Sequence, residues 1–322
     1  MWGAELLNLI DKKYKLLDSN DFIEDNKLYR GKDIRNDRDV LIKLIKINES
    51  ICDEFLTNLI DEITVLSDLN SPYMLKTLDV GVEKFEGSLY VYIISEYYKG
   101  VTLDVIIAEQ DLQLDYVIKI VIQALKSLES AHSVQTYHGS LNPSSIIVDE
   151  NYNVKVCDFG ITKANNGVHT RCAGSLDYMC PHQLCVDYTD KDSDFFSLGE
   201  IFYEAYFGEK IFGNFTSEKE LLKVIDKGIN WNISKYKDES KELIRVLSKL
   251  LDRDKSYSNS QEVIIDLSGI MYEKATEEDE LREEFYEVIK EQEKREKSRL
   301  FKNIILAILI ILMIVTMVIV YF

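Results

Sequence analysis

The sequence lacks the cysteine patterns that would indicate a metal site or a disulfide framework. Its five cysteines are an odd number, and no two of them are separated by only two residues. Zinc sites and small disulfide-rich domains usually show paired cysteines at short, regular spacing. The sequence therefore argues against both classes, and we expect the cysteines to be ordinary reduced thiols.

Positive charge is also scarce. Lys and Arg together number 38 against 56 Asp and Glu, which gives a formal net charge of −18. Nucleic-acid binding requires a basic face that neutralises phosphates, and the globular part of the sequence shows no basic stripe. We therefore expect no nucleic-acid partner. Residues 1–5 lack both a basic and an apolar region, so we predict no secretory signal.

The most informative segment reads Tyr-His-Gly-Ser-Leu-Asn-Pro-Ser-Ser-Ile at 137–146, followed by Cys-Asp-Phe-Gly at 157–160. It resembles the catalytic loop and the Asp-Phe-Gly turn of a protein kinase. In active kinases, an Asp, a Lys and an Asn of this loop handle the substrate proton, the transferring phosphate and a metal ion. Those positions hold Ser140, Asn142 and Ser145 in this chain. The resemblance thus implies a catalytic loop whose chemical groups have changed.

Five further motifs stand in kinase order around this loop. They are Val-Leu-Ile-Lys at 40–43, Asp-Glu-Ile-Thr-Val-Leu at 61–66, the strand-like run 89–97, Gly-Ser-Leu-Asp-Tyr-Met-Cys-Pro at 174–181 and Ser-Asp-Phe-Phe-Ser-Leu-Gly at 193–199. One such match would be weak because short motifs arise by chance, but five in order are specific. The sequence therefore resembles the eukaryotic-like serine/threonine protein kinase family over about Tyr14–Tyr272.

The resemblance implies an α+β, bilobal, protein-kinase-like fold for residues 14–272, with a small β-rich N-lobe and a larger helical C-lobe. A hydrophobic content of 46% over 322 residues is sufficient for a sizeable core. Leu66, His138, Phe159 and Asp194 match positions that the family packs in its centre. We therefore expect both lobes to be well formed.

The resemblance also implies where a nucleotide would bind. The corresponding residues are Lys43, Glu62, Glu96, Tyr98 and Asp158. In the family pattern Lys43 pairs with Glu62, and Asp158 is the expected ligand of Mg²⁺. The alternative interpretation of Lys43, Glu62 and Asp158 is a buried ion-pair network that supports the cleft without any ligand.

Other positions argue against tight ATP binding. The three glycines of the family's phosphate loop correspond to Asp21, Ile23 and Asn26, whose side chains would block the close approach of backbone amides to phosphates. Leu41 stands where the family has a small Ala over the adenine ring, so it adds bulk to that slot. We expect ATP and Mg²⁺ to bind weakly or not at all, and useful binding is the alternative.

Two family positions that normally pair have changed together. His182 stands where the family has a Glu, and Ser256 stands where it has the Arg that pairs with this Glu. Losing both partners leaves no unpaired buried charge, so the fold can tolerate the double change. Arg253 is the nearby arginine that could reach across instead.

The sequence from Asn303 to Phe322 contains no charged residue, and about 20 apolar residues suffice to cross a bilayer core of about 30 Å. Lysines and arginines crowd residues 294–302, so the positive-inside rule places the kinase-like domain in the cytosol. We predict a single-pass membrane protein with a C-terminal tail anchor.

Residues 275–302 are charge-dense and free of Gly and Pro. We interpret them as a juxtamembrane helical spacer. A short coiled coil or a partner-binding helix is the alternative, because a narrow apolar stripe runs along this segment for two turns.

Two functional classes fit these observations. The first is a membrane-tethered pseudokinase that scaffolds or allosterically regulates an unidentified cytosolic or membrane protein in signalling. Ser140, Asn142 and Ser145 favour it, since a neutral serine cannot replace a carboxylate base. The second is a divergent serine/threonine protein kinase with weak or altered ATP-dependent transfer, which the retained Lys43, Glu62 and Asp158 favour. We predict the first, and hence a protein that is not an active enzyme.

Overall fold

The computed structural model describes residues 9–17, 27–49, 52–85, 87–164, 176–186, 188–237, 239–253, 256–274 and 276. The chain divides into two units, Met1–Ser268 and Gly269–Phe322. In the second unit, residues 269–274 and 276 are helical. Among the residues just named, no helix combines the length and the apolar character that crossing a membrane requires. The predicted membrane segment 303–322 and residues 277–302 of the predicted spacer lie outside the described residues.

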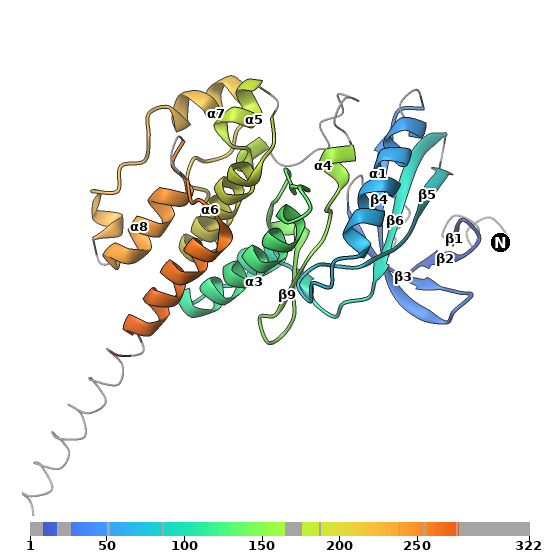
Figure 1. Cartoon of the computed structure of the whole chain (residues 1–322), viewed down its shortest axis with the longest axis horizontal. Helices are drawn as coiled ribbons and strands as arrows, with labels where there is room; N and C mark the ends of the chain where they lie inside the picture. The colour runs from blue at the N-terminus through green and yellow to red at the C-terminus, as the bar shows by residue number, and fades with distance from the viewer. Residues whose placement is uncertain are drawn as a thin grey trace, which may run out of the picture. The chain divides into compact units, whose positions relative to one another are not determined.

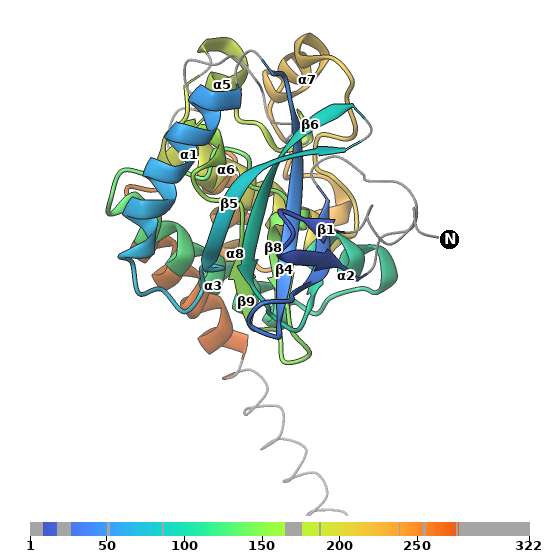
Figure 2. The same ribbon diagram turned by 90° about the vertical axis from the view of Figure 1, so that its right-hand side faces the viewer.

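The N-terminal part of the first unit is a six-stranded antiparallel sheet in the order β1-β2-β3-β4-β6-β5. Helix α1 (Cys52–Ser67) lies beside this sheet (Figure 1, Figure 2). The strands are β1 (Leu9–Ile10), β2 (Tyr14–Leu16), β3 (Leu28–Asp33), β4 (Arg38–Ile47), β5 (Thr77–Phe85) and β6 (Ser88–Glu96).

The alternation of side chains along β6 explains how the sheet builds two apolar layers. Tyr90, Tyr92 and Ile94 join a buried cluster with residues of β1 to β4. Val91 and Ile93 belong to a different buried cluster, together with residues of α1. Successive side chains on a strand point to opposite faces, so one face of the sheet packs on α1 and the other builds its own core.

The rest of the first unit is mainly helical, with a small antiparallel sheet in the order β7-β8-β9. Figure 1 shows α3 running beside α6. The elements are β7 (Val101–Thr102), α2 (Leu103–Glu109), α3 (Leu114–His132), η1 (Pro143–Ser145), β8 (Ile146–Val148), β9 (Val154–Val156), α4 (Ile161–Ala164), η2 (Leu176–Tyr178), α5 (Pro181–Val186), α6 (Lys191–Phe207), α7 (Glu218–Ile225), η3 (Ser234–Tyr236) and α8 (Lys241–Leu250). Residues 260–268 are also helical.

Helix α6 is the central element of this region. Twelve of its 17 residues are buried, which is the pattern of a helix enclosed by protein on all sides. The Asp190 side chain caps its N-terminus, and Gly208 ends it with a left-handed φ of 73°. A Cβ at Gly199 would lie only 2.9 Å from the Cβ of Leu250, so this glycine allows α8 to pack directly against α6.

Candidate functional site

Lys43 and Asp158 form a buried ion pair at the junction of the sheet-rich and helical parts. Lys43 lies on β4, and Asp158 follows β9; their side chains are 6% and 11% exposed. Asp158 has a left-handed φ of 71°, and Gly160 follows with a φ of 85°, a conformation that glycine adopts without strain. The turn thereby directs the Asp158 carboxylate to the Lys43 ammonium.

Glu62 on α1 has a different partner from the one predicted. Its carboxylate accepts a hydrogen bond from Thr136 Oγ1 at 3.0 Å and lies 2.9 Å from Lys163 Nζ of α4. The predicted ion pair between Lys43 and Glu62 is absent from the part of the chain that the structure describes.

The reason is the close packing of α4 against α1, which lie beside each other in Figure 1. A Cβ at Gly160 would lie 3.0 Å from the Cβ of Glu62, so only a glycine permits this approach without displacing α1. The Asn58 side-chain amide also donates to the Ala164 carbonyl at 3.2 Å. Lys163 is thereby brought next to Glu62 and forms an ion pair with its carboxylate.

The three predicted catalytic-loop positions bond to one another and to their own backbone. Asn142 Nδ2 donates to the Ser140 carbonyl at 2.9 Å, and Asn142 Oδ1 accepts from the Ser144 backbone N–H at 2.9 Å. Ser145 Oγ donates to the Asn142 carbonyl at 2.7 Å and accepts from the Asn142 N–H at 3.2 Å. These bonds cap the short helix η1. Asn142 and Ser145 therefore serve the local backbone, and neither supplies a charge.

Ser140 is the nearest counterpart of the family's catalytic base. Its hydroxyl accepts a hydrogen bond from Thr162 Oγ1 at 3.3 Å. A serine hydroxyl is neutral near pH 7, whereas general-base catalysis by an acidic residue uses an ionised carboxylate. Ser140 and Thr162 therefore form a pair of neutral hydroxyl groups at the position predicted for the base.

Leu41, which the resemblance places over the adenine ring, is buried against other side chains of the protein. Leu41 of β4 belongs to one buried cluster with Leu75, Ile147 of β8 and Cys157, and Tyr98 packs against it. Leu41 of the N-terminal sheet and Ile147 of the small second sheet thus share one buried cluster.

The two remaining predicted nucleotide contacts have protein partners. Glu96 accepts from Lys155 Nζ at 2.7 Å and from the Lys76 N–H at 3.2 Å. Burial raises the pKa of Tyr98 to about 12, and the neighbouring Asp149 carboxylate adds to this shift. The predicted phosphate-loop positions Asp21, Ile23 and Asn26 lie outside the described residues.

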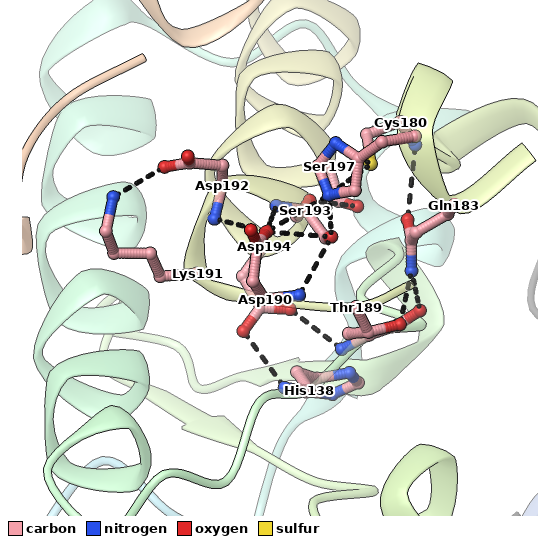
Figure 3. A network of polar contacts seen from close by, with 12 residues as sticks. His138, Cys180, Gln183, Thr189, Asp190, Lys191, Asp192, Ser193, Asp194 and Ser197 are labelled. Atoms are coloured by element: carbon pink, nitrogen blue, oxygen red, sulfur yellow. Dashed lines mark hydrogen bonds and ion pairs between the residues drawn. The ribbon is translucent and has the colours of Figure 1, made fainter. Parts of the chain in front are cut away.

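The loop is anchored to α6 through Asp194, which is completely buried. Its carboxylate accepts from the backbone N–H groups of His138 and Gly139 at 2.9 and 2.7 Å and contacts His132 Nε2 at 2.7 Å. Figure 3 shows His138 beside the N-terminus of α6. Burial lowers the pKa of His138, and its ring stands edge-on to Phe159 with centroids 5.0 Å apart. The loop that begins at His138 is therefore held by hydrogen bonds to Asp194 of α6 and by the contact between His138 and Phe159.

His182 connects α5 to the start of α6. Its Nε2 lies 3.1 Å from Asp190 Oδ1 and 2.9 Å from Ser193 Oγ. Arg253, considered above as a partner, instead pairs with Asp226. His182 is therefore held by the residues that cap α6 and not by Arg253.

Cys180, His182 and Asp190 follow one another in the manner of a cysteine nucleophile with its base. Cys180 Sγ lies 3.4 Å from His182 Nδ1. However, Cys180 is only 1% exposed, and burial raises the pKa of its thiol to about 11. Because the thiolate is the reactive form, we assign this group a structural role.

Residues 25–266 match the family described as protein kinase domain. The chain therefore belongs to this family, and the match confirms the predicted kinase-like fold of its sheet-rich and helical parts.

The relatives include a probable serine/threonine-protein kinase of Clostridium perfringens, 31% identical over 256 residues, which are 76% of this chain and 36% of that protein. The serine/threonine-protein kinase PrkC of Bacillus subtilis is 32% identical over 186 residues, 56% of this chain and 28% of that protein. PknB of Mycobacterium tuberculosis is 29% identical over 210 residues, 63% of this chain and 34% of that protein. The chain thus spans roughly a third of the length of these relatives.

Proposed function

We propose that this chain is a non-catalytic member of the protein kinase family that scaffolds or allosterically regulates a protein partner. The observation that carries the proposal is the closed hydrogen-bond network of Ser140, Asn142 and Ser145. A missing general base typically costs a factor of about 10² to 10⁴ in rate. Missing phosphate and metal contacts weaken the same transition state further, because phosphoryl transfer depends on positioning and on charge stabilisation.

The state of the nucleotide slot supports the same proposal. Lys43 and Asp158 are suited to hold a phosphate and one Mg²⁺, but Leu41, at the position of the family's small Ala, adds bulk and packs in one buried cluster with Ile147. The family's second metal contact is replaced by Ser145, whose hydroxyl is bonded to the Asn142 backbone. We infer that ATP and Mg²⁺ bind weakly or not at all and that regulation does not require them.

A divergent serine/threonine protein kinase is the second candidate. The Lys43–Asp158 ion pair favours it, because the family uses these two residues to hold phosphate and metal. The names of the three relatives, all serine/threonine-protein kinases, also favour phosphotransfer. The two candidates differ in whether the protein transfers a phosphoryl group from ATP to itself or to a substrate.

The purified soluble part, Met1 to Arg299, is expected to transfer no radiolabel from ATP to itself or to a generic substrate above background. The Asp158→Ala variant serves as the matched control, and both proteins should give the same signal. Label that appears with the native sequence and disappears in Asp158→Ala would establish the second candidate.

Millimolar Mg-ATP is expected to cause little or no thermal shift of the native protein, whereas Leu41→Ala should respond because it opens the adenine slot. A ligand at 100 times its dissociation constant stabilises a protein by about 2.7 kcal/mol. The comparison requires differential scanning fluorimetry of both proteins and of Lys43→Ala. A strong native shift that Lys43→Ala removes would contradict the nucleotide-independent proposal.

We also propose that residues 303–322 attach the protein to a membrane with the kinase domain on the cytosolic side. Replacing Ile311, near the middle of this segment, with Arg is expected to weaken insertion by about 3 kcal/mol. Ile311→Leu is the control and should behave like the native chain. Carbonate extraction of membranes provides the measurement. Full retention of Ile311→Arg in the membrane pellet would contradict the proposal that residues 303–322 attach the protein to the membrane.

A further inference from the structure

The segment between α7 and α8 (Figure 1) carries positive charge, although the chain as a whole is acidic. Residues 223–241 contain five lysines and three acidic residues, a formal charge of +2, whereas the whole chain carries −18. We call residues 226–240 the η3 loop, because the short helix η3 lies within it. A local excess of positive charge on an acidic protein favours a negatively charged partner.

The described acidic side chains of the η3 loop have partners within the protein, whereas two of its lysines do not. Asp226 pairs with Arg253, and Glu239 accepts a hydrogen bond from a tyrosine hydroxyl of α6 at 3.0 Å. Lys227 and Lys237 are exposed, and their ammonium groups have no hydrogen bond or ion pair among the described residues. The charge that remains for an external partner is therefore positive.

Apolar side chains accompany these lysines in the η3 loop. Ile233 is 44% exposed, and Trp231 is half-buried, with its ring centroid 5.1 Å from that of Tyr236. A single exposed isoleucine is common on protein surfaces and by itself indicates no partner. A tryptophan and an isoleucine beside unpaired lysines are, however, the combination that proteins place at a lipid surface. There the apolar groups enter the interface and the ammonium groups meet anionic headgroups.

Lys235 holds the η3 loop in one conformation. Its ammonium lies over three aromatic rings, 4.9 Å from the centroid of Tyr203, 4.9 Å from that of Phe207 and 5.8 Å from that of Tyr236. It also donates to the Tyr203 hydroxyl at 2.7 Å and pairs with Glu209. Contacts of a cation with aromatic rings are attractive, most of all where water is partly excluded. Lys235 is thus used within the fold, and the loop does not have to be ordered when it binds a partner.

We propose that the η3 loop docks on an anionic membrane surface, with Ile233 and Trp231 in the lipid interface and Lys227 and Lys237 against the headgroups. This inference rests on the membrane attachment proposed above. One lysine near an anionic surface improves binding about fivefold, which is little for a free protein. A membrane tether raises the effective concentration to about the millimolar range, so weak docking is sufficient to orient the kinase domain on the membrane.

The test uses the full chain, inserted into preformed vesicles of brominated phosphatidylcholine with or without phosphatidylglycerol. Bromine quenches tryptophan fluorescence on contact, and Trp2→Phe leaves Trp231 as the sole tryptophan. We expect Trp231 to be quenched in the anionic vesicles and less so in the neutral ones. Ile233→Asp should remove at least about half of the quenching, because a carboxylate resists entry into lipid. Ile265→Asp, at a side chain that is 67% exposed outside the η3 loop, is the matched control and should be quenched like its parent.

A second variant tests the lysines without changing the apolar side chains. Lys227→Gln combined with Lys237→Gln should lower the ratio of docked to undocked protein by about 25-fold, which is about fivefold for each lysine. Lys12→Gln combined with Lys15→Gln removes the same charge from exposed positions at β2 and should have little effect. Equal losses in the two double variants would overturn the assignment of the docking surface to the η3 loop.

Flotation of the chain with the vesicles measures the attachment separately from the docking. A chain that floats without quenching of Trp231 overturns the docking and leaves the attachment in place, and an acidic protein partner of the η3 loop predicts this result. Equal quenching losses in Ile233→Asp and Ile265→Asp also overturn the docking. A chain that does not float overturns both proposals.

Discussion

Replacing Asp194 with Ala is expected to lower the free energy of unfolding by about 3–5 kcal/mol, the usual effect of removing one partner from a buried charged network. The Asp194 carboxylate is 0% exposed and accepts from the His138 and Gly139 N–H groups while contacting His132. Without it, these polar groups stay buried with no acceptor, and each such group costs about 1–3 kcal/mol. Chemical denaturation followed by circular dichroism measures the loss.

Asp192→Ala is the matched control for this experiment. Asp192 lies two residues earlier in the same helix, but its side chain is 41% exposed and pairs with the neighbouring Lys191. Exposed ion pairs contribute about 0–1 kcal/mol, so this variant should be nearly as stable as the native chain. Equal losses in both variants would show that the helix start, and not the buried anchor, determines the stability.

Replacing Glu200 with Met is expected to stabilise the protein at neutral and alkaline pH. Glu200 is only 4% exposed, and its Oε1 has no hydrogen-bond partner among the described residues. Burial raises the pKa of Glu200 well above its usual value, and the nearby Asp177 and Glu204 carboxylates add to the shift while Lys210 opposes it. The fold therefore favours the protonated acid.

The sign of the pH dependence follows from this raised pKa. The contribution of Glu200 is most favourable below its unfolded pKa of about 4.3, and it is lost as the pH rises toward the folded pKa. Over that interval each pH unit costs up to about 1.4 kcal/mol. The stability advantage of Glu200→Met should therefore be smallest near pH 4 and should grow as the pH rises.

Thermal denaturation of both proteins between pH 4 and pH 8 checks this expectation. Glu204→Gln is the control, because Glu204 accepts a hydrogen bond from the Tyr178 hydroxyl and its loss should not stabilise the fold. A constant difference between Glu200→Met and the native protein at every pH would argue that Glu200 is not buried as an acid.

The sequence by itself was sufficient to predict the kinase-like fold, which the family match confirms, and to identify the residues of the loop. These predictions depend on patterns within short stretches of sequence. Examples are the alternating side chains of β6 and the motifs in their fixed order. The network at Asn142 and Ser145 forms within four residues, so short-range side-chain chemistry is sufficient to explain it. The absence of a carboxylate base at Ser140 is likewise a prediction made from residue identity alone.

The tertiary structure alone decided which partners the central charged side chains take. Glu62 and Lys163 are far apart in sequence, and they meet because Gly160 lets α4 approach α1. In the same way, Leu41 of the N-terminal sheet meets Ile147 of the small second sheet in one buried cluster. Sequence motifs and periodicity report which residues share a face of one element. They do not report how closely two elements approach, which is what determines an ion pair or a cavity.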